Sequence, residues 1–394
     1  MSAGPLAGVR VVDLSVAATG PYAAAILADQ GADVVKVERP GIGDIGRWVG
    51  TMSGGMSALF QVCNRGKRGI AVDLQKPEGR DIARLLIQEA DVVVQNWRPG
   101  VAERLGLGYD DVSRPDLVYV AISGFGSSGP YASKSAYDTV IQAYAGVLAN
   151  ESAPGTGEPR AVSQVLADKV TALTAAQAIT AALLARAGGR GGQYLELSMF
   201  DAVVSFMWID CAGNLVLPDG DGTQPGSFAT AVPPLRFKDG WGVVTPTSDA
   251  DFAGTCRALG VSGYDDPRVA TIDQRRQNRA VAAELMRRCR EEAERMTTAE
   301  GMARLEAERV PCGVVLGPAD LLTDPHAREV GMITESIGAV AGHIRQPRHP
   351  ARFGATPAEV GGAAPALGEH TDAILAELGL GGRVGELRRQ GVVA

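Results

Sequence analysis

The feature that most constrains the fold is the alternation of short apolar runs and helical segments through the first two hundred residues. Residues 21–30 and 77–90 have the composition of helices, and the first of these is followed by Gly31. Apolar runs separated by helices predict a parallel sheet that is covered on both faces. The predicted strands are VRVVDL (9–14), ADVVKVE (32–38), GIAVDL (69–74), DVVVQN (91–96), LVYVAIS (117–123) and QYLELS (193–198).

Polar side chains follow these predicted strands at the points where the strands end. Asp13 and Ser15 follow the first strand, Arg39 the second, Asp73 the third and Asn96 the fourth. In open α/β sheets, ligands bind outside the carboxyl ends of the strands. The sequence therefore predicts a ligand site at this edge of the sheet.

After Tyr137 the chain becomes mainly helical, and its composition then changes twice. Residues 217–234 are rich in glycine, aspartate and proline, which is typical of a linker. Helices are predicted from Asp138, over 168–187, from Met199 and over 370–378. We expect a large domain over 1–216, a linker over 217–234, a small domain over 235–320 and a C-terminal part over 321–394 that returns to the large domain.

Composition excludes several classes of function. The net charge is −7, and no basic stripe suited to nucleic acid is present. The apolar run 171–187 is interrupted by Gln177 and Arg186, so it predicts a buried helix and not a membrane span. The N-terminus lacks the pattern of a signal peptide, and five scattered cysteines fit a reducing compartment. We expect a cytoplasmic protein that binds neither nucleic acid nor membrane.

Familiar cofactor and triad motifs are absent or incomplete. The string GIGDIG (41–46) has the spacing GxGxxG, but Pro40 precedes it and no amphipathic helix follows, so we interpret it as a loop at the sheet edge. All four histidines lie at or beyond His326, without metal-ligand spacing. The string GFGSSGP (124–130) does not match GxSxG; it is either a loop whose amides face a ligand or a tight turn.

The chemistry is therefore expected to rest on carboxylates, amides and arginines. A carboxylate of ordinary pKa, about 3.9, is ionised at neutral pH and needs no partner base to attack an acyl carbon. Asp13, Asp138 and Asp168 all fall near the predicted sheet edge or at a predicted helix start. An aspartate at a helix start is more often a cap than a catalyst. These physical arguments do not choose among the three acids.

Longer strings, taken in order along the chain, carry a family resemblance. They are GVRVVDLSVAATGPYAAAILADQGADVVKVERPGIGD, NRGKRGIAVDL, ADVVVQNWRPG, SGFGSSGPYASKSAYD, GGQYLELSMFDAV, TDPHAREVGMI and PALGEHTDAILAELG. Together they resemble the family III coenzyme A transferases, the CaiB/BaiF family, which contains formyl-CoA and carnitine CoA transferases. The resemblance covers about residues 6–210 and 311–380.

The resemblance implies a fold, an oligomer and a nucleophile. The fold is α/β, with a Rossmann-like parallel sheet in the large domain and a smaller α/β domain. The family forms interlocked homodimers in which each chain threads through the other. Its nucleophile is an aspartate that begins a helix after a YDxxxQ segment, and the matching residue here is Asp168 in QVLADKVTAL. Ala172 stands where the family usually has glycine.

The resemblance also implies how coenzyme A is held. Guanidinium groups suit its phosphates, and an indole suits its adenine. Tyr137 is expected beside the thioester, and residues 220–226 are the nearest match to a glycine loop that shields the intermediate in some members. The residues that match coenzyme A contacts are Ala17, Arg39, Val72, Gln75, Asn96, Trp97 and Arg104.

The implied reaction moves coenzyme A from an acyl-CoA to a carboxylic acid through an aspartyl-CoA thioester, with coenzyme A as a substrate and no tightly bound cofactor. One alternative is an α-methylacyl-CoA racemase, which has the same fold. Such racemases have a histidine where this chain has Tyr137, and a phenol of ordinary pKa about 10 is a poor base. A CoA-binding protein without turnover is the other alternative, and the presence of Asp168 argues against it.

Overall fold

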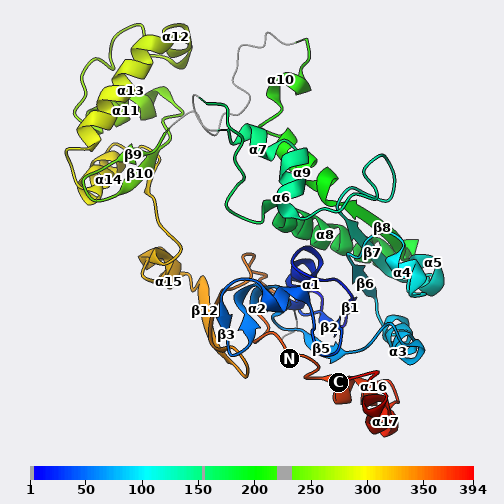
Figure 1. Cartoon of the computed structure of the whole chain (residues 1–394). Coiled ribbons are helices and arrows are strands. Elements are labelled where there is room, and N and C mark those ends of the chain that lie inside the picture. The colour runs from blue at the N-terminus through cyan, green and yellow to red at the C-terminus, as the bar shows by residue number, and fades with distance from the viewer. Residues whose placement is uncertain (1–3, 153–155, 220–232) are drawn as a thin grey trace. The chain divides into compact units, whose positions relative to one another are not determined.

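The computed structural model describes residues 4–152, 156–219 and 233–394 (Figure 1). The chain forms two compact units, a large unit of residues 1–209 with 329–394 and a small unit of residues 210–328. The sequence-based division ended the large domain at 216 and resumed it at 321. Most of the predicted linker, 217–234, and all of the predicted glycine loop, 220–226, lie outside the described residues.

The large unit is built on a six-stranded parallel sheet with the strand order β5-β2-β1-β6-β7-β8. The chain runs outward from β1 to β5, returns to β6 beside β1 and then runs the other way. The gap between β1 and β6 is thus a topological switch point, where α/β folds bind ligands. All six predicted strands are confirmed: β1 (Arg10–Asp13), β2 (Asp33–Glu38), β5 (Arg68–Ala71), β6 (Val92–Gln95), β7 (Val118–Ser123) and β8 (Gln193–Ser198).

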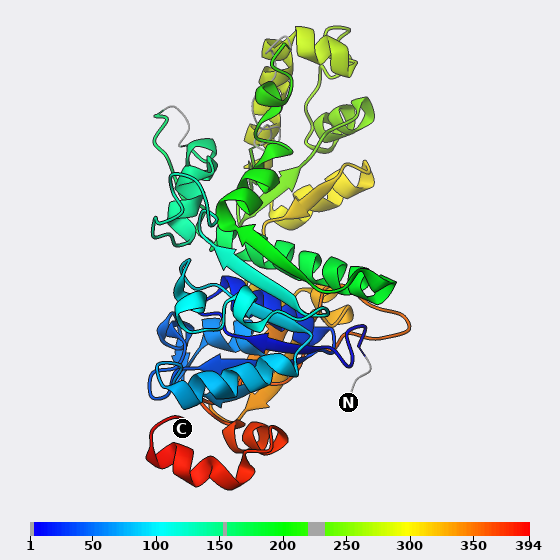
Figure 2. The same ribbon diagram turned by 90° about the vertical axis from the view of Figure 1, so that its right-hand side faces the viewer.

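Neighbouring strand residues enter different hydrophobic cores, because side chains alternate across a sheet. Val11 and Val92 pack with α1, α8 and α9, whereas Val12 and Val93 pack with α3, α16 and α17. Figures 1 and 2 show these two helix groups on opposite sides of the sheet. The helices are α1 (Thr19–Asp29), α3 (Pro77–Gln88), α6 (Asp138–Tyr144), α8 (Leu166–Ala185), α9 (Met199–Trp208), α16 (Thr371–Glu377) and α17 (Val384–Arg389).

The run 171–187 was expected to form a buried helix, and in the structure helix α8 is buried on one face and exposed on the other. Ala172 and Ile179 lie in the core, but the side chains of Leu173 and Leu184 are 57% and 74% exposed. By length and composition alone, Leu166–Arg190 is apolar enough to cross a membrane. Its inner face nevertheless packs against α1 and α9.

Short elements complete the large unit around the sheet. Helix α2 contributes Phe60 to a small core with Met56 and Ala364. Strands β12 and β13 form an antiparallel hairpin, as do β3 and β4. The elements are η1 (Ile45–Trp48), β3 (Met52–Ser53), β4 (Met56–Ser57), α2 (Ala58–Asn64), α4 (Val101–Arg104), α5 (Tyr109–Val112), α7 (Val147–Asn150), η2 (Arg186–Arg190), β12 (Ile333–Gly338), β13 (Gly342–Pro347) and η5 (Gly381–Arg383).

The small unit packs helices on a three-stranded antiparallel sheet with the order β11-β10-β9. Its core joins Phe237 and Phe252 to Leu285. The highly charged stretch 272–293 forms two helices, α12 and α13, and exposed pairs such as Arg287 with Glu284 line its surface. The elements are α10 (Gly213–Val216), β9 (Leu235–Arg236), β10 (Trp241–Val244), α11 (Asp249–Ala258), α12 (Ile272–Gln277), α13 (Arg279–Ala293), α14 (Thr298–Ala307), β11 (Cys312–Val314), η4 (Asp320–Leu322) and α15 (Pro325–Glu329), which crosses into the large unit.

Candidate active site

The loop between β1 and α1 lies at the switch point and is held by side chains from neighbouring segments. Asn96, just after β6, exchanges two hydrogen bonds of 2.8 Å with the backbone of Val16. The N–H of Ala17 donates to Asp44 Oδ1 at 2.8 Å, and Ala17 has a left-handed backbone with φ of +67°. Asn96 and Asp44 thus fix the shape of this loop.

A buried group of charged side chains lies next to the loop between β1 and α1. Asp13 is fully buried; it accepts the N–H of Ser15 at 3.0 Å and pairs with Lys67 Nζ at 2.7 Å and Lys36 Nζ at 3.9 Å. Burial acts to raise the pKa of Asp13, but the two lysine charges outweigh it and the pKa lies below its ordinary value. Asp13 is therefore an ionised structural anchor and is not open to a substrate.

A pocket of about 310 Å³ adjoins this loop at the carboxyl ends of β1, β2 and β5. Four predicted coenzyme A contacts line it together: Arg39, Val72, Gln75 and Trp97. The rest of its wall combines an apolar part, made of Leu14, Val16, Val37, Leu74, Val101 and Leu105, with the charged residues Lys36, Glu38, Asp44 and Asp73. A pocket that combines apolar walls with placed polar groups is typical of a small-molecule site.

Three arginines at the sheet edge have no acidic partner among the described residues. Arg39, Arg98 and Arg104 are exposed, and within the part of the chain that the structure describes their side chains make no ion pair or hydrogen bond. Arg104 does not line the pocket but ends α4, the helix that begins with the pocket residue Val101. Unpaired guanidinium groups beside a pocket suit a phosphate-bearing ligand.

Asp168 lies in the first turn of α8, half-buried against α1. Its Oδ1 accepts a hydrogen bond from the hydroxyl of Thr19, the first residue of α1. Its Oδ2 has no partner among the described residues and is not completely buried. One carboxylate oxygen is therefore held and the other is free to react.

Asp138 supports Asp168 through its backbone. Asp138 Oδ2 accepts the N–H of Asp168 at 3.0 Å, and Oδ1 accepts from Gln142 Nε2 at 2.5 Å. The first turn of a helix has N–H groups without helical partners, and Val165 at the N-cap of α8 provides no side-chain bond. Asp138 therefore caps α8 from another helix, with both of its oxygens engaged.

The surroundings of Asp168 raise the pKa of its carboxyl group. Burial is the main cause, and the charge of Asp138 adds to it, while the hydrogen bond from Thr19 acts in the opposite direction. The sequence had suggested an ordinary value. A carboxylate that is partly removed from water is less well solvated, and therefore a more basic nucleophile, than an exposed one.

The two glycine-rich strings have different roles. In GIGDIG, Gly43 and Asp44 line the pocket, and only the short helix η1 follows. In GFGSSGP, the N–H of Gly126 donates to Ser123 Oγ at 2.9 Å and that of Ser127 to Glu196 Oε1 at 2.6 Å. These two amides are already engaged, which favours the tight turn over a ligand-facing loop.

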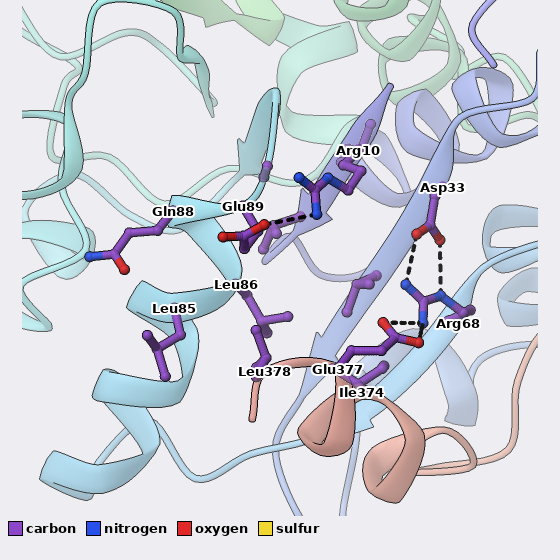
Figure 3. A pocket seen from close by; sticks show the side chains of 14 residues that line it. Arg10, Asp33, Arg68, Leu85, Leu86, Gln88, Glu89, Ile374, Glu377 and Leu378 are labelled. Carbon is purple, nitrogen blue, oxygen red and sulfur yellow. Dashed lines mark hydrogen bonds and ion pairs between the residues drawn. The ribbon is translucent and has the colours of Figure 1, made fainter. Parts of the chain in front are cut away.

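A second pocket, of about 260 Å³, lies at the amino ends of the strands (Figure 3). There Arg68 is held between Asp33 and Glu377, with bonds of 2.7 to 2.9 Å, and Arg10 pairs with Glu89 at 3.0 Å. Its arginines are neutralised, and ligands of α/β sheets bind at the other end. Among the described residues, no group of His, Cys, Asp or Glu side chains is placed to hold a metal ion.

Comparison with known proteins identifies the family. The model of CoA-transferase family III matches residues 6–371. The chain belongs to CoA-transferase family III. It is 34% identical to an acyl-CoA transferase of Fusarium pseudograminearum (96% of this chain, 86% of the relative) and 31% identical to succinyl-CoA:glutarate CoA-transferase of Homo sapiens (99% and 90%). The crystal structure of a CAIB/BAIF family protein from Brucella suis superposes with a TM-score of 0.82, at 32% identity, over 96% of this chain and 100% of that one.

Membership in family III confirms the predicted enzyme class, a CoA transferase that acts on an acyl-CoA and a carboxylic acid. The roles of individual residues stay predictions, but the structure shows where each of these residues lies. Ala17 and Asn96 shape the loop at the pocket, and Tyr137 is 72% exposed beside Asp138. Ala172, in place of the usual glycine, lies buried in an unbroken α8.

Sequence reasoning missed three residues of this family III site. Lys36 and Lys67 are fully buried beside Asp13, and the hydroxyl of Thr19 binds Asp168. A lysine at the centre of the apolar run VVKVE is a signal that was available, because an unpaired lysine is rarely buried. Thr19 gave no such signal, since its partner lies 149 residues away.

Proposed function

We propose that this CoA transferase works through a covalent intermediate on Asp168. The observation that carries the proposal is the asymmetry of its carboxylate, in which Oδ1 is bound by Thr19 and Oδ2 has no partner in the part of the chain that the structure describes. Asp13 and Asp138, the other two candidate acids, have their carboxylates engaged by buried partners. Asp168 is the one of the three with an oxygen available to a substrate.

The proposed reaction has two exchanges at the carboxyl group of Asp168. Oδ2 attacks the acyl carbon of the donor, the C–S bond breaks, and a mixed anhydride and the CoA thiolate result. The thiolate attacks the aspartyl carbon and forms the aspartyl-CoA thioester, and the donor acid leaves with the bridging oxygen. An acceptor carboxylate then attacks the aspartyl carbon, and the released thiolate takes the acceptor's acyl group to complete the transfer.

Coenzyme A is proposed to bind in the pocket at the carboxyl ends of β1, β2 and β5. Trp97 and the apolar wall suit the adenine, and Arg39 with Arg104 suits the phosphates. Calorimetric titration of Arg39→Ala and Arg104→Ala with CoA tests this binding site. Each variant is expected to bind CoA about 10 to 100 times more weakly, as for the loss of a hydrogen bond to a charged group; unchanged affinity in both would place the phosphates elsewhere.

Chemical trapping of the enzyme tests the covalent route directly. The wild-type chain is incubated with an acyl-CoA and hydroxylamine, which converts an activated aspartyl group to a hydroxamate, and the peptides are then analysed by mass spectrometry. Modification of the peptide that contains Asp168 supports the proposal, and modification at Asp138 or at neither residue contradicts it. The name of the human relative, succinyl-CoA:glutarate CoA-transferase, makes short dicarboxylic acids the first donors and acceptors to screen.

We also propose that the protein is a cytoplasmic homodimer. Apolar side chains stand exposed along α8 and α9 and just beyond them, with Leu184 74% and Ile209 83% exposed. Exposed apolar patches of this kind mark interaction surfaces. Light scattering after gel filtration should give twice the chain mass of 40.9 kDa.

A further inference from the structure

The hydroxyl of Thr19 is used in an unusual way for a residue at a helix start. Thr19 is the first residue of α1 and is 3% exposed. A threonine at this end often bonds to its own helix, but α1 has no side-chain cap. Among the described residues, the hydroxyl of Thr19 bonds instead to Asp168 Oδ1 on α8. The polar group of Thr19 thus serves another helix.

The position of that hydroxyl is fixed by the loop before it. Val16 is bonded to Asn96 and Ala17 to Asp44, each at 2.8 Å, just before α1 begins. A donor held by such a loop presents its proton in one direction without reorganisation when the reaction takes place.

We propose that Thr19 is a positioning residue for acyl transfer, whose hydroxyl holds Asp168 Oδ1 so that Oδ2 faces the thioester. This inference rests on the proposed function, because it assumes that Asp168 is the nucleophile. In the aspartyl-CoA thioester, Oδ1 becomes the carbonyl oxygen, and the same hydroxyl donates to the oxyanion that forms when a carboxylate attacks. Thr19 therefore acts in both exchanges.

The charged and titratable groups that face Asp168 set the sign of the pH test. Asp138 on α6 raises the pKa of Asp168, and the hydrogen bond from Thr19 lowers it. Cys63 on α2 also interacts with Asp168, but burial raises the pKa of that thiol to about 11, so it is neutral where Asp168 titrates. Loss of the Thr19 hydroxyl is therefore expected to raise the pKa of Asp168, and loss of the Asp138 charge to lower it.

The experiment compares Thr19→Val, which removes the hydroxyl at nearly constant shape, with Thr19→Ser, which keeps it. For Thr19→Val, kcat/KM is expected to fall about 10- to 100-fold, as for the loss of one hydrogen bond to a charged group. The acid limb of its pH profile should move to higher pH, whereas Asp138→Asn should move this limb to lower pH. Thr19→Ser should restore both rate and pH profile, and CoA affinity should be unchanged in both Thr19 variants.

The outcomes separate this inference from the proposed function. If hydroxylamine labels Asp168 in the wild type but Thr19→Val keeps the wild-type rate and pH profile, the Thr19 inference is wrong and the covalent route stands. If Thr19→Val lowers the thermal midpoint and the rate without moving the acid limb, Thr19 has only a packing role. If Asp168 is not labelled in the wild type, the proposed function itself fails.

Discussion

Two helix starts, at Asp138 and Asp168, have the same residue type in the first turn and opposite roles in the structure. Asp138 is 8% exposed, and its two oxygens accept from Gln142 and from the backbone of Asp168. The backbone N–H of Asp168 donates one of these hydrogen bonds, and its own Oδ2 has no partner within residues 4–152, 156–219 and 233–394. A carboxylate whose lone pairs are committed stabilises the fold, whereas one with a free oxygen can form a bond.

The contrast shows how a fold prepares a nucleophile at a cost in its own stability. The pKa of Asp168 is raised, mainly by burial, so folding disfavours the ionised form that the reaction needs. The pKa of Asp13 is lowered, because its lysine partners outweigh burial. Ionised Asp13 therefore stabilises the folded chain, and ionised Asp168 destabilises it.

The largest expected effect is the difference in turnover between the variants Asp168→Asn and Asp138→Asn. Asp168→Asn removes the nucleophile, and turnover is expected to fall on the order of 10⁴ to 10⁶-fold with CoA binding retained. Asp138→Asn keeps the nucleophile but loosens its support, so turnover should fall by roughly 10- to 100-fold. Steady-state rates and CoA titration of both variants check this; an equal loss of turnover in the two would remove the distinction.

Asp138→Asn should lose more stability than Asp168→Asn, although Asp168→Asn should lose more turnover. Gln142 cannot turn to suit an asparagine at 138, because its Oε1 accepts from Val162 N–H at 3.1 Å and its Nε2 also donates to Gln164 C=O at 3.0 Å. Asp138→Asn thus sets two donors against each other in a buried site, and we expect a loss of about 1 to 3 kcal/mol in the free energy of unfolding. Urea denaturation measures it; a change below about 0.5 kcal/mol would show that Asp138 is not the cap of α8.

Much of the fold and the choice of nucleophile could be predicted from the sequence. Contacts between side chains far apart in the chain could not. Apolar runs separated by helices were enough to predict the sheet, because successive residues such as Val11 and Val12 face two different cores and both must be apolar. Family strings then selected Asp168, which helix-start physics had not separated from Asp138. The hydrogen bond from Thr19 was out of reach, since it joins residues 149 positions apart and depends on side-chain direction.

The pH dependence of stability should separate Asp168→Asn from the wild type in a defined direction. The folded pKa of Asp168 lies above the unfolded value of 3.8, so folded chains bind more protons between the two values and lose stability as pH rises through this window. Asp168→Asn lacks this loss. Its free energy of unfolding should equal or exceed that of the wild type at pH 7, and the difference should shrink below the window. A variant less stable than the wild type at pH 7, by chemical denaturation, would contradict the raised pKa.

The smallest effect is expected at Tyr137, the N-cap residue of the Asp138 helix, and it decides between transfer and racemisation. Racemisation requires a base that takes the α-proton and an acid that returns one, and this chain has a phenol, which is a poor base, where the racemases have an imidazole. Tyr137 is 72% exposed, and its hydroxyl has a single proton, so it can donate one hydrogen bond to the thioester oxygen. Tyr137→Phe should therefore slow transfer by the value of one hydrogen bond, about 0.5 to 1.5 kcal/mol or roughly 2- to 12-fold.

In D₂O, a 2-methylacyl-CoA should gain no α-deuterium at a rate comparable with transfer. Rapid uptake by the wild type that is lost in Asp168→Asn would instead make Asp168 a proton-transfer group.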